Sequence, residues 1–307
     1  EPTRAALVYL AREWPIGEDF PALAGSVGDP GGVELDDPDP AVVTARLLAG
    51  SEHDVARLIP LLGESHEPLR REAARRLAHV KDVARLRPIL AWLDEPRLPN
   101  APLAVAELLG RLGGRARPLV EPALASGRAG ALAWAARWIA EHPADDLHDA
   151  LLDAAAGRLS RVTTGAERRV AVALLDACGL LLARGHDEHH DAWLECIRLG
   201  FACEELDVRD AAAAAALIAG RPQLALASLE RISPALRARV LVRLDIATLE
   251  PALVERLRAD ADGRVRAALV APGGGLDDGD PLVRIAGLVP DTAARLLDDP
   301  DASVRRA

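Results

Sequence analysis

Apolar residues recur every three or four positions through residues 53–80, a spacing that indicates two short helices. In the second of these, residues 67–80, four apolar residues share one face: Leu69, Ala73, Leu77 and Val80. The sequence GESHEP between the helices is typical of a turn, and Pro68 suits a first helical turn because no amide donor is needed there. Neither helix can bury its apolar face alone, so the pattern predicts that such pairs stack on one another.

A second feature recurs along the chain, in which a turn rich in aspartate precedes an apolar residue and an arginine. Copies occur at 207–209 (DVR), 262–269 (DGRVRAAL), 280–286 (DPLVRIA) and 298–307 (DDPDASVRRA), with a weaker copy that lacks the arginine at 37–45. Together with Pro60 in a first helix and Leu69-Arg70 in a second, this pattern resembles the HEAT repeat. The last copies shorten, with Val265, Val283 and Val304 standing 18 and 21 residues apart, and resemble leucine-rich repeat variants.

The resemblance implies an all-α fold, a right-handed α-solenoid of stacked antiparallel helix pairs. It divides the chain into an N-terminal helix with an irregular connection (1–40), HEAT-like repeats (41–247) and short leucine-rich-variant-like repeats that continue the solenoid (248–307). The last repeat stops partway at Ala307, so we expect more chain in the natural protein. The periodicity predicts helices at 3–14, 40–49, 54–63, 67–80, 82–94, 101–113, 115–126, 129–141, 144–158, 165–184, 188–201, 205–219, 221–230 and 234–244.

The aspartate and the arginine of each repeat have a structural interpretation. An aspartate before a helix accepts hydrogen bonds from the amides of the first turn. In HEAT proteins this aspartate also pairs with the arginine that follows valine, which forms a ladder between repeats. We therefore interpret three pairs as structural: Asp207/Arg209, Asp262/Arg266 and Asp280/Arg284.

Composition narrows the class of protein. Apolar residues form 50% of the 307 residues and aromatic ones only 3%, so leucine, alanine and valine must build the core. The basic residues are almost all arginine, which with abundant alanine, glycine and proline is typical of a GC-rich bacterial genome. The formal net charge of −10 argues against general nucleic-acid binding, which needs a basic surface. Three cysteines do not make a disulfide framework and no apolar stretch is long enough for a bilayer, so we predict a cytoplasmic protein with no membrane contact.

No catalytic signature is visible in the sequence. It contains no Walker motif, no dinucleotide-binding glycine fingerprint and no nucleophile elbow. Deoxyhypusine hydroxylases, which share HEAT-like repeats, hold two irons with His-Glu pairs just after the Val-Arg position. Here the matching pairs are Arg71-Glu72, Asp210-Ala211 and Ala267-Ala268. We therefore expect no cofactor and interpret the chain as a non-catalytic scaffold that binds a protein partner.

A metal-dependent activity is one alternative function. The run from residue 186 to 191 is rich in metal ligands, and His186, His189, His190 and Asp191 are the candidates. The run also follows Gly185 at the start of a predicted helix, where acidic residues cap orphan amides and favour the helix dipole. On this second interpretation, which we prefer, the histidines are solvated and hold no metal.

A DNA-repair or nucleic-acid-binding function is the other alternative. HEAT-like alkylpurine DNA glycosylases use tryptophans and an aspartate in a basic groove, and Trp134 and Trp138 stand four residues apart here. Arg71, Arg75 and Arg76 add local positive charge. No aspartate accompanies the tryptophans and the chain is acidic, so we favour two indoles that pack between repeats.

We predict that the protein partner docks on the concave face, which the second helices of a solenoid line. On these helices, side chains opposite the core have no neighbour to satisfy them, and arginine and tryptophan are the residues most enriched at binding hot spots. The predicted contact residues are Arg71, Arg75, His79, Arg137, Trp138 and Arg168. The competing interpretation is a solvated charged face, on which Glu72 and Arg76 form an ordinary ion pair one helical turn apart.

Overall fold

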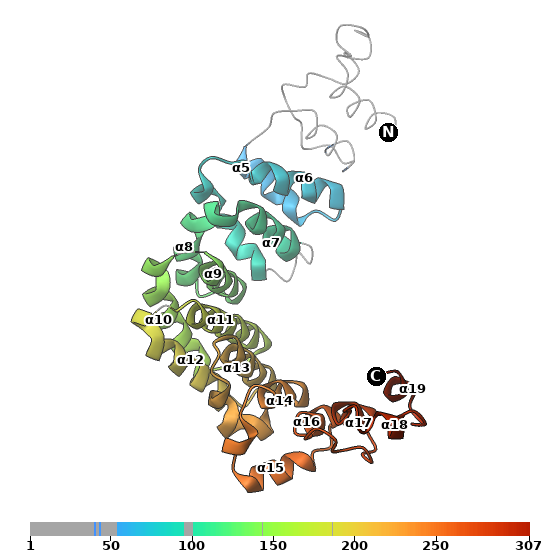
Figure 1. Ribbon diagram of the computed structural model, residues 1–307. Coiled ribbons are helices and arrows are strands. Elements are labelled where there is room, and N and C mark those ends of the chain that lie inside the picture. The colour runs from blue at the N-terminus through green and yellow to red at the C-terminus, as the bar shows by residue number, and fades with distance from the viewer. Residues whose placement is uncertain (1–39, 41–42, 44–53, 95–100, 143, 186) are drawn as a thin grey trace, which may run out of the picture. The chain divides into compact units, whose positions relative to one another are not determined.

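The computed structural model describes residues 40, 43, 54–94, 101–142, 144–185 and 187–307 (Figure 1). Every regular element within these residues is a helix, which confirms the predicted all-α class. The predicted helix at 3–14 lies outside the described residues, as does most of the one at 40–49. The chain divides into two compact units, Glu1–Trp138 and Ile139–Ala307. The boundaries predicted from the sequence, after residues 40 and 247, divide the chain by type of repeat and not by compact unit. They stay predictions.

The described part of the first unit is built from short helices in pairs. Its α-helices and 3₁₀ helices (η) are α5 (Val55–Leu58), η1 (Pro60–Gly63), α6 (Glu67–Leu77), η2 (Val83–Asp94), α7 (Ala101–Leu112), η3 (Gly113–Leu119), α8 (Val120–Ala125) and α9 (Ala129–Glu141). Helix α6 packs on η1 before it and on α7 after it, and α7 packs in turn on η2 and η3. The second helix of a pair therefore contacts both its own partner and the next pair.

Prolines change the first helix of these pairs. The predicted helix at 54–63 is divided into α5 and η1 at Pro60, and the one at 82–94 forms the 3₁₀ helix η2, which contains Pro88. Proline lacks an amide donor and its ring clashes with the carbonyl four residues earlier, so the tighter three-residue pattern replaces the α-helical one. The hydrophobic spacing predicts the positions of these helices but not their type.

The second unit continues the alternation of first and second helices. Its longer elements are α10 (His148–Leu159), α11 (Gly165–Ala183), α12 (His190–Ala202), α13 (Leu206–Ile218), η6 (Pro222–Arg231), α14 (Pro234–Leu241), α15 (Pro251–Arg258), α16 (Gly263–Ala267), α17 (Pro281–Ala286), α18 (Ala293–Leu296) and α19 (Ala302–Arg306). Single 3₁₀ turns are η4 (Asp145–Leu147), η5 (Asp187–His189) and η7 (Ile246–Thr248). The second helices contact one another in the order α11, α13, α14, α16, α17 and α19, a row that we call the second-helix layer.

Small residues bring the two longest second helices close together. A methyl group added at Gly179 of α11 would lie 2.8 Å from the Cα atom of Ala215 in α13, which is closer than atoms pack. Five of the six alanines in the run from Ala211 to Ala216 are buried, so this run packs tightly on its neighbours. Glycine and alanine at this contact let the two backbones approach, and leucines fill the space around them.

Arginine–aspartate pairs join successive repeats in the second half of this unit. The three pairs are Arg237–Asp260, Arg266–Asp278 and Arg284–Asp299. Asp262 and Asp280 do cap their helices, since their carboxylates accept hydrogen bonds of 2.9 Å from the amides two residues later. They are not the ladder partners, however, because each ladder arginine reaches the aspartate that precedes the next capping residue by two positions. This finding corrects the ladder predicted from the sequence.

The earlier copy of the motif is arranged differently. Helix α13 begins at Leu206 after Glu205, so Asp207 lies inside the first turn and is not the capping residue. Arg209 donates hydrogen bonds to the carbonyls of Cys203 and Arg231, at 2.9 and 2.8 Å. The arginine is structural, as predicted, but its partners are backbone oxygens.

Candidate partner-binding groove

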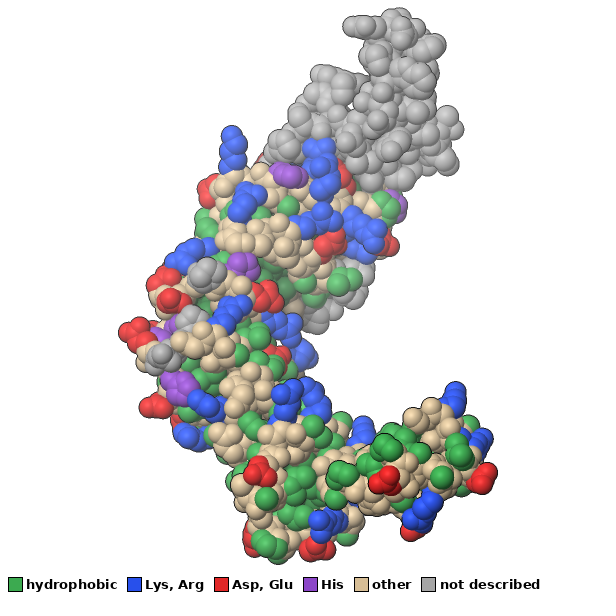
Figure 2. Space-filling view, viewed as in Figure 1, with side chains coloured by type: hydrophobic (Ala, Val, Ile, Leu, Met, Phe, Trp, Pro, Cys, Tyr) green, Lys and Arg blue, Asp and Glu red, His purple; other side chains and the backbone are tan. Residues whose placement is uncertain are grey.

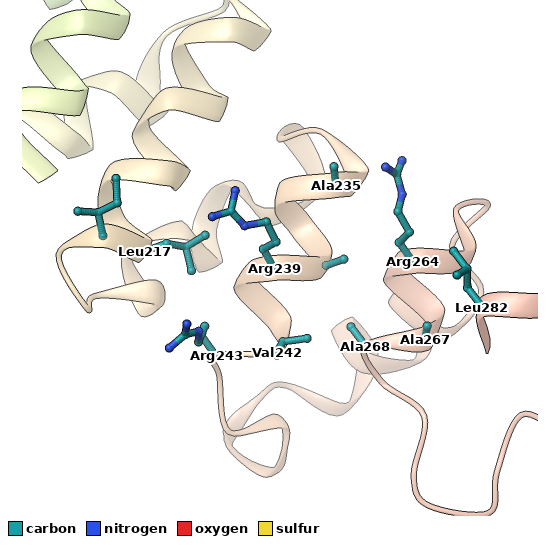
Figure 3. Close-up of a pocket in the computed structure, with 11 residues that line it drawn as sticks. Leu217, Ala235, Arg239, Val242, Arg243, Arg264, Ala267, Ala268 and Leu282 are labelled. Carbon is teal, nitrogen blue, oxygen red and sulfur yellow. The ribbon is translucent and has the colours of Figure 1, made fainter. Parts of the chain in front are cut away.

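An open groove of about 880 Å³ lies among four second helices of the second unit (Figure 3). Its lining comes from the end of α13, from α14 and the turn after it, from α16, and from the start of α17. None of the residues that line it belongs to a first helix. The groove therefore lies on the second-helix layer, and none of the six contact residues predicted from the sequence is among the described residues that line it.

The floor of the groove is apolar and exposed. Ile218, Val242 and Leu282 are 44%, 68% and 48% exposed, and they are three of the seven large hydrophobic residues that stand exposed in the described part of the chain. Figure 2 shows hydrophobic side chains on the surface around α16 and α17, with basic side chains beside them. Exposed apolar side chains such as these cost free energy in water, and their grouping in one groove makes the groove a candidate interaction site.

Short helices and small side chains create the hollow. Helix α13 has 13 residues, whereas α14 has 8, α16 has 5 and α17 has 6, so the later helices cover less of their neighbours. Alanines face the hollow where α14 and α16 meet: Ala235, Ala238, Ala267 and Ala268. Without larger side chains at these positions the hollow stays open, and Figure 3 shows Leu217 and Val242 beside it.

The rim of the groove is positively charged. Arg239, Arg243 and Arg264 line it, and of the described lining residues none is acidic and none is aromatic. The guanidinium of Arg264 pairs with Asp262 at 2.7 Å and keeps half of its side chain exposed. The side chains of Arg239 and Arg243 are exposed, and neither side chain forms a hydrogen bond or ion pair with another described residue. In a chain of formal net charge −10, this is a local reversal of sign.

The three contact residues predicted on α6 do not share one exposed helix face. Arg71 is exposed and pairs with Glu67 of its own helix at 2.6 Å, and His79 lies in the turn after the last helical residue, Leu77. Arg75 is half-buried and donates two hydrogen bonds of 2.7 Å to Glu72. Leu69, Ala73 and Leu77 are buried, as the pattern predicts.

The pair of Glu72 and Arg76 is not an ordinary surface pair. The two residues are only 6% and 5% exposed, and the Nε atom of Arg76 lies 2.9 Å from the Glu72 carboxylate. Burial by itself would raise the pKa of Glu72, but hydrogen bonds and charge from Arg75 and Arg76 outweigh that effect and lower the pKa. The helical spacing alone predicts that this pair lies at the surface. That prediction is wrong, because neighbouring helices bury both side chains.

The remaining predicted contact residues divide into one exposed side chain and two that serve packing. Arg137 is exposed on α9. Trp138 is 5% exposed and its indole Nε1 donates a hydrogen bond of 2.9 Å to the carbonyl of Gly113, which corrects the prediction that it faces a partner. Arg168 on α11 pairs with Glu205 at 3.1 Å and so links α11 to the start of α13.

The histidines proposed as metal ligands lie near a cluster of rings. His189 stands 3.8 Å from Asp149 through its Nε2 atom, and its ring meets the rings of His148 and Trp193 edge to face. His190 is half-buried and Asp191 exposed, while His186 lies outside the described residues. The described residues contain no group of three or more histidine, cysteine, aspartate or glutamate side chains arranged to hold a metal ion. The sequence run did not reveal His148, which α10 supplies from a distant position.

Two of the three cysteines form a buried pair. Cys178 and Cys196 are 1% and 4% exposed, and Cys203 is half-buried. A hydrogen bond with Cys196, together with burial, raises the pKa of Cys178 well above its ordinary value. A thiol held in its protonated form is a poor nucleophile, so Cys178 packs as a small apolar residue.

Comparisons with known proteins identify no family for this chain. No protein-family model, no curated protein and no solved structure matches the chain. Among the described helices, none has both the length and the apolar character needed to cross a bilayer. The resemblance to HEAT repeats and leucine-rich variants therefore rests on the residues of the chain alone.

Proposed function

We propose that the chain is a non-catalytic α-solenoid of HEAT-like and leucine-rich-variant-like repeats that binds a protein partner through its second helices. The groove between α13 and α17 carries the proposal. Exposed apolar side chains, Val242 above all, lie there beside Arg239 and Arg243, whose side chains form no ion pair with another described residue. Apolar patches rimmed by polar groups are typical of binding surfaces, and exposed arginines are common at their hot spots.

The order in which the helices of the second unit contact one another supports the solenoid. Successive second helices touch in chain order, and from α14 onward neighbouring repeats are joined by arginine–aspartate pairs such as Arg266–Asp278. A solenoid is defined by such nearest-neighbour contacts. Small-angle scattering tests the architecture: the radius of gyration should exceed roughly 19 Å, the value expected of a compact domain of this length. A value at or below that figure would contradict the solenoid.

Protein fits the groove better than nucleic acid does. Proteins that bind single strands stack bases on aromatic side chains, and the described lining contains none. Trp138, which the DNA-repair alternative requires at the surface, is buried and hydrogen-bonded to Gly113. The overall charge of −10 also opposes the binding of a polyanion.

The first unit contributes two exposed arginines, Arg71 on α6 and Arg137 on α9. We propose both as partner contacts of the first unit taken by itself. Arg75 and Arg168 support their own helices through pairs with Glu72 and Glu205.

Site-specific photo-crosslinking tests the proposed function. A photoreactive amino acid is placed at Val242 in one variant and at Leu297 in another, because these residues are equally exposed at 68% and 67% but only Val242 lines the groove. We expect a protein to crosslink at Val242 and not at Leu297 in an extract of cells that express the chain. The captured protein is then purified, and its affinity should fall for Val242→Asp and stay unchanged for Leu297→Asp. Equal affinity for the two variants would contradict binding at the groove.

A further inference from the structure

We propose that the segment which the groove binds is an acidic amphipathic helix of the partner protein. This inference rests on the proposed function and adds the chemistry of the partner. Three observations carry it: the apolar floor, the one-sided charge of the rim, and the purely helical walls.

The apolar floor calls for a stripe of apolar side chains. Ile218, Val242 and Leu282 come from α13, from the turn after α14 and from α17, and the alanines between them leave space that larger side chains of a partner can fill. A helix that enters a groove between helices presents such a stripe at positions i, i+3, i+4 and i+7. Leucine-sized residues at those positions would remove the exposed floor from water.

The rim sets the charge of the partner. Arg239, Arg243 and Arg264 stand on α14, the turn after it, and α16, and Figure 3 shows Arg239 and Arg264 pointing toward the same side of the groove. Arg264 is paired with Asp262 at 2.7 Å, so the positive charge that no described acidic side chain offsets comes from Arg239 and Arg243. Carboxylates that flank the apolar stripe of the partner would pair with these guanidinium groups, whereas lysines at the same positions would be repelled.

The walls exclude an extended peptide. A strand binds by hydrogen bonds to a free sheet edge, and the described residues that form this groove are all in helices or in the turns that end them. Helix backbones have already satisfied their amides and carbonyls internally, so an extended peptide would bury backbone groups without partners. A helical segment brings its own internal hydrogen bonds and avoids that cost.

A displayed peptide library tests the inference directly. Each peptide has leucine or isoleucine fixed at i, i+3, i+4 and i+7, and its other positions are drawn from Glu, Lys, Ser and Gln. Binders are selected on the full chain, with counter-selection on the Val242→Asp variant. We expect glutamate to be enriched beside the apolar stripe. Enrichment of lysine, or no enrichment over the counter-selected variant, would overturn the acidic helix.

The strongest binder is then synthesised with a fluorophore and titrated against matched variants. In Arg239→Glu/Arg243→Glu the rim is reversed. In the control, Arg198→Glu/Arg256→Glu, two arginines of the first helices α12 and α15 with 55% and 56% exposed side chains receive the same change of charge. We expect affinity to fall about tenfold or more in the first variant and to stay unchanged in the control. A twin peptide with lysine in place of glutamate should prefer the reversed rim, and equal losses in both variants would show non-specific attraction.

Further probes separate this inference from the proposed function. A single-stranded oligonucleotide or anionic vesicles that bind the wild-type chain more tightly than the peptide, with loss in Arg239→Glu/Arg243→Glu, would overturn the protein helix as occupant. If the captured partner depends on Val242 while no acidic helix binds, the inference is wrong and protein binding at the groove stands. If acidic helices bind the groove and no natural partner depends on it, the proposed function fails instead.

Discussion

The guanidinium of Arg284 on α17 donates two hydrogen bonds to the carboxylate of Asp299, of 2.8 and 2.9 Å, across the connection to α19. Both residues are buried, and Arg284 also donates to the carbonyl of Asp278, at 2.7 Å, on the opposite side. The Asp299 carboxylate in turn accepts from the amide of Asp301, the residue that caps α19. One arginine therefore holds the turn before its own helix and the turn before the next.

Removal of this contact should open the end of the chain. We expect Asp299→Ala to increase hydrogen exchange across α17 and α19, because it leaves the buried Arg284 without its counter-charge. Asp277→Ala is the matched control, since Asp277 pairs with Arg295 at 3.5 Å but both side chains are exposed. The control should exchange like the wild type. Equal protection in the two variants would show that the Arg284–Asp299 pair does not hold the repeats together.

The ladder also shows how far the sequence predicts the fold. The spacing of Asp278 and Asp280 and the arginine after each valine are visible in the sequence, and so is the position of most helices. Which aspartate caps its helix and which one reaches an arginine depends on the distance between repeats, which no local pattern contains. The first helices that contain Pro60 and Pro88 are 3₁₀ helices. This change of type could have been predicted, because proline lacks the amide donor that an α-helix needs.

The groove depends almost wholly on tertiary structure. Val242 and Arg243 read as one more turn of a helix predicted at 234–244, but α14 ends at Leu241 and leaves both residues exposed. Trp138 is the opposite case, a residue predicted at the surface that is buried. Its spacing from Trp134 suits a surface pair, but its indole is buried and donates a hydrogen bond to the carbonyl of Gly113. Helical periodicity tells which residues share a face, and only the neighbours of that face decide whether it is covered.

The buried carboxylate of Glu72 provides a second prediction. Glu72→Ala removes the buried carboxylate that pairs with Arg76, which is itself buried, so we expect the free energy of unfolding to fall by about 3–5 kcal/mol. Glu67→Ala removes a pair of the same spacing on the same helix, but Glu67 and Arg71 have 58% and 66% exposed side chains. That change should cost about 0.5 kcal/mol or less. Urea titrations of both variants provide the comparison, and similar losses would mean that Glu72 is solvated.

Two glycines inside helices should respond oppositely to alanine. A methyl group at Gly157 of α10 meets no atom within 4 Å, so Gly157→Ala should stabilise the protein by about 0.5–1 kcal/mol through helix propensity. At Gly179 of α11 the same methyl group would lie 2.8 Å from the backbone of Ala215. Gly179→Ala should therefore destabilise the protein by about 1–3 kcal/mol. Chemical unfolding of each variant measures the difference, and a stabilising Gly179→Ala would disprove the close contact of α11 with α13.

Glu167 should make the stability of the second unit depend on pH. Hydrogen bonds from the backbone and side chain of Thr163, and from the backbone of Thr164, lower the pKa of Glu167 from 4.5 to about 2. This carboxylate also closes the capping box that begins α11 with Thr164. Because the folded-state pKa is lowered, the contribution of the charge is complete above about 4.5 and is lost as pH falls toward about 2. Glu167→Gln should therefore unfold at lower urea than the wild type at pH 7, and the two should converge as pH falls below 4.5.

The control for this prediction is Asp153→Asn, which removes an exposed carboxylate on α10. The Asp153 side chain accepts no hydrogen bond from another described residue, so its variant should follow the wild type at every pH. The urea midpoints are measured between pH 7 and pH 3, with helicity as the signal. A difference between Glu167→Gln and wild type that stays constant across this range would mean that the capping box acts through its geometry and not through the charge of Glu167. A difference that grows as pH falls would reverse the sign required by a lowered pKa and would place the stabilising interaction on the protonated form.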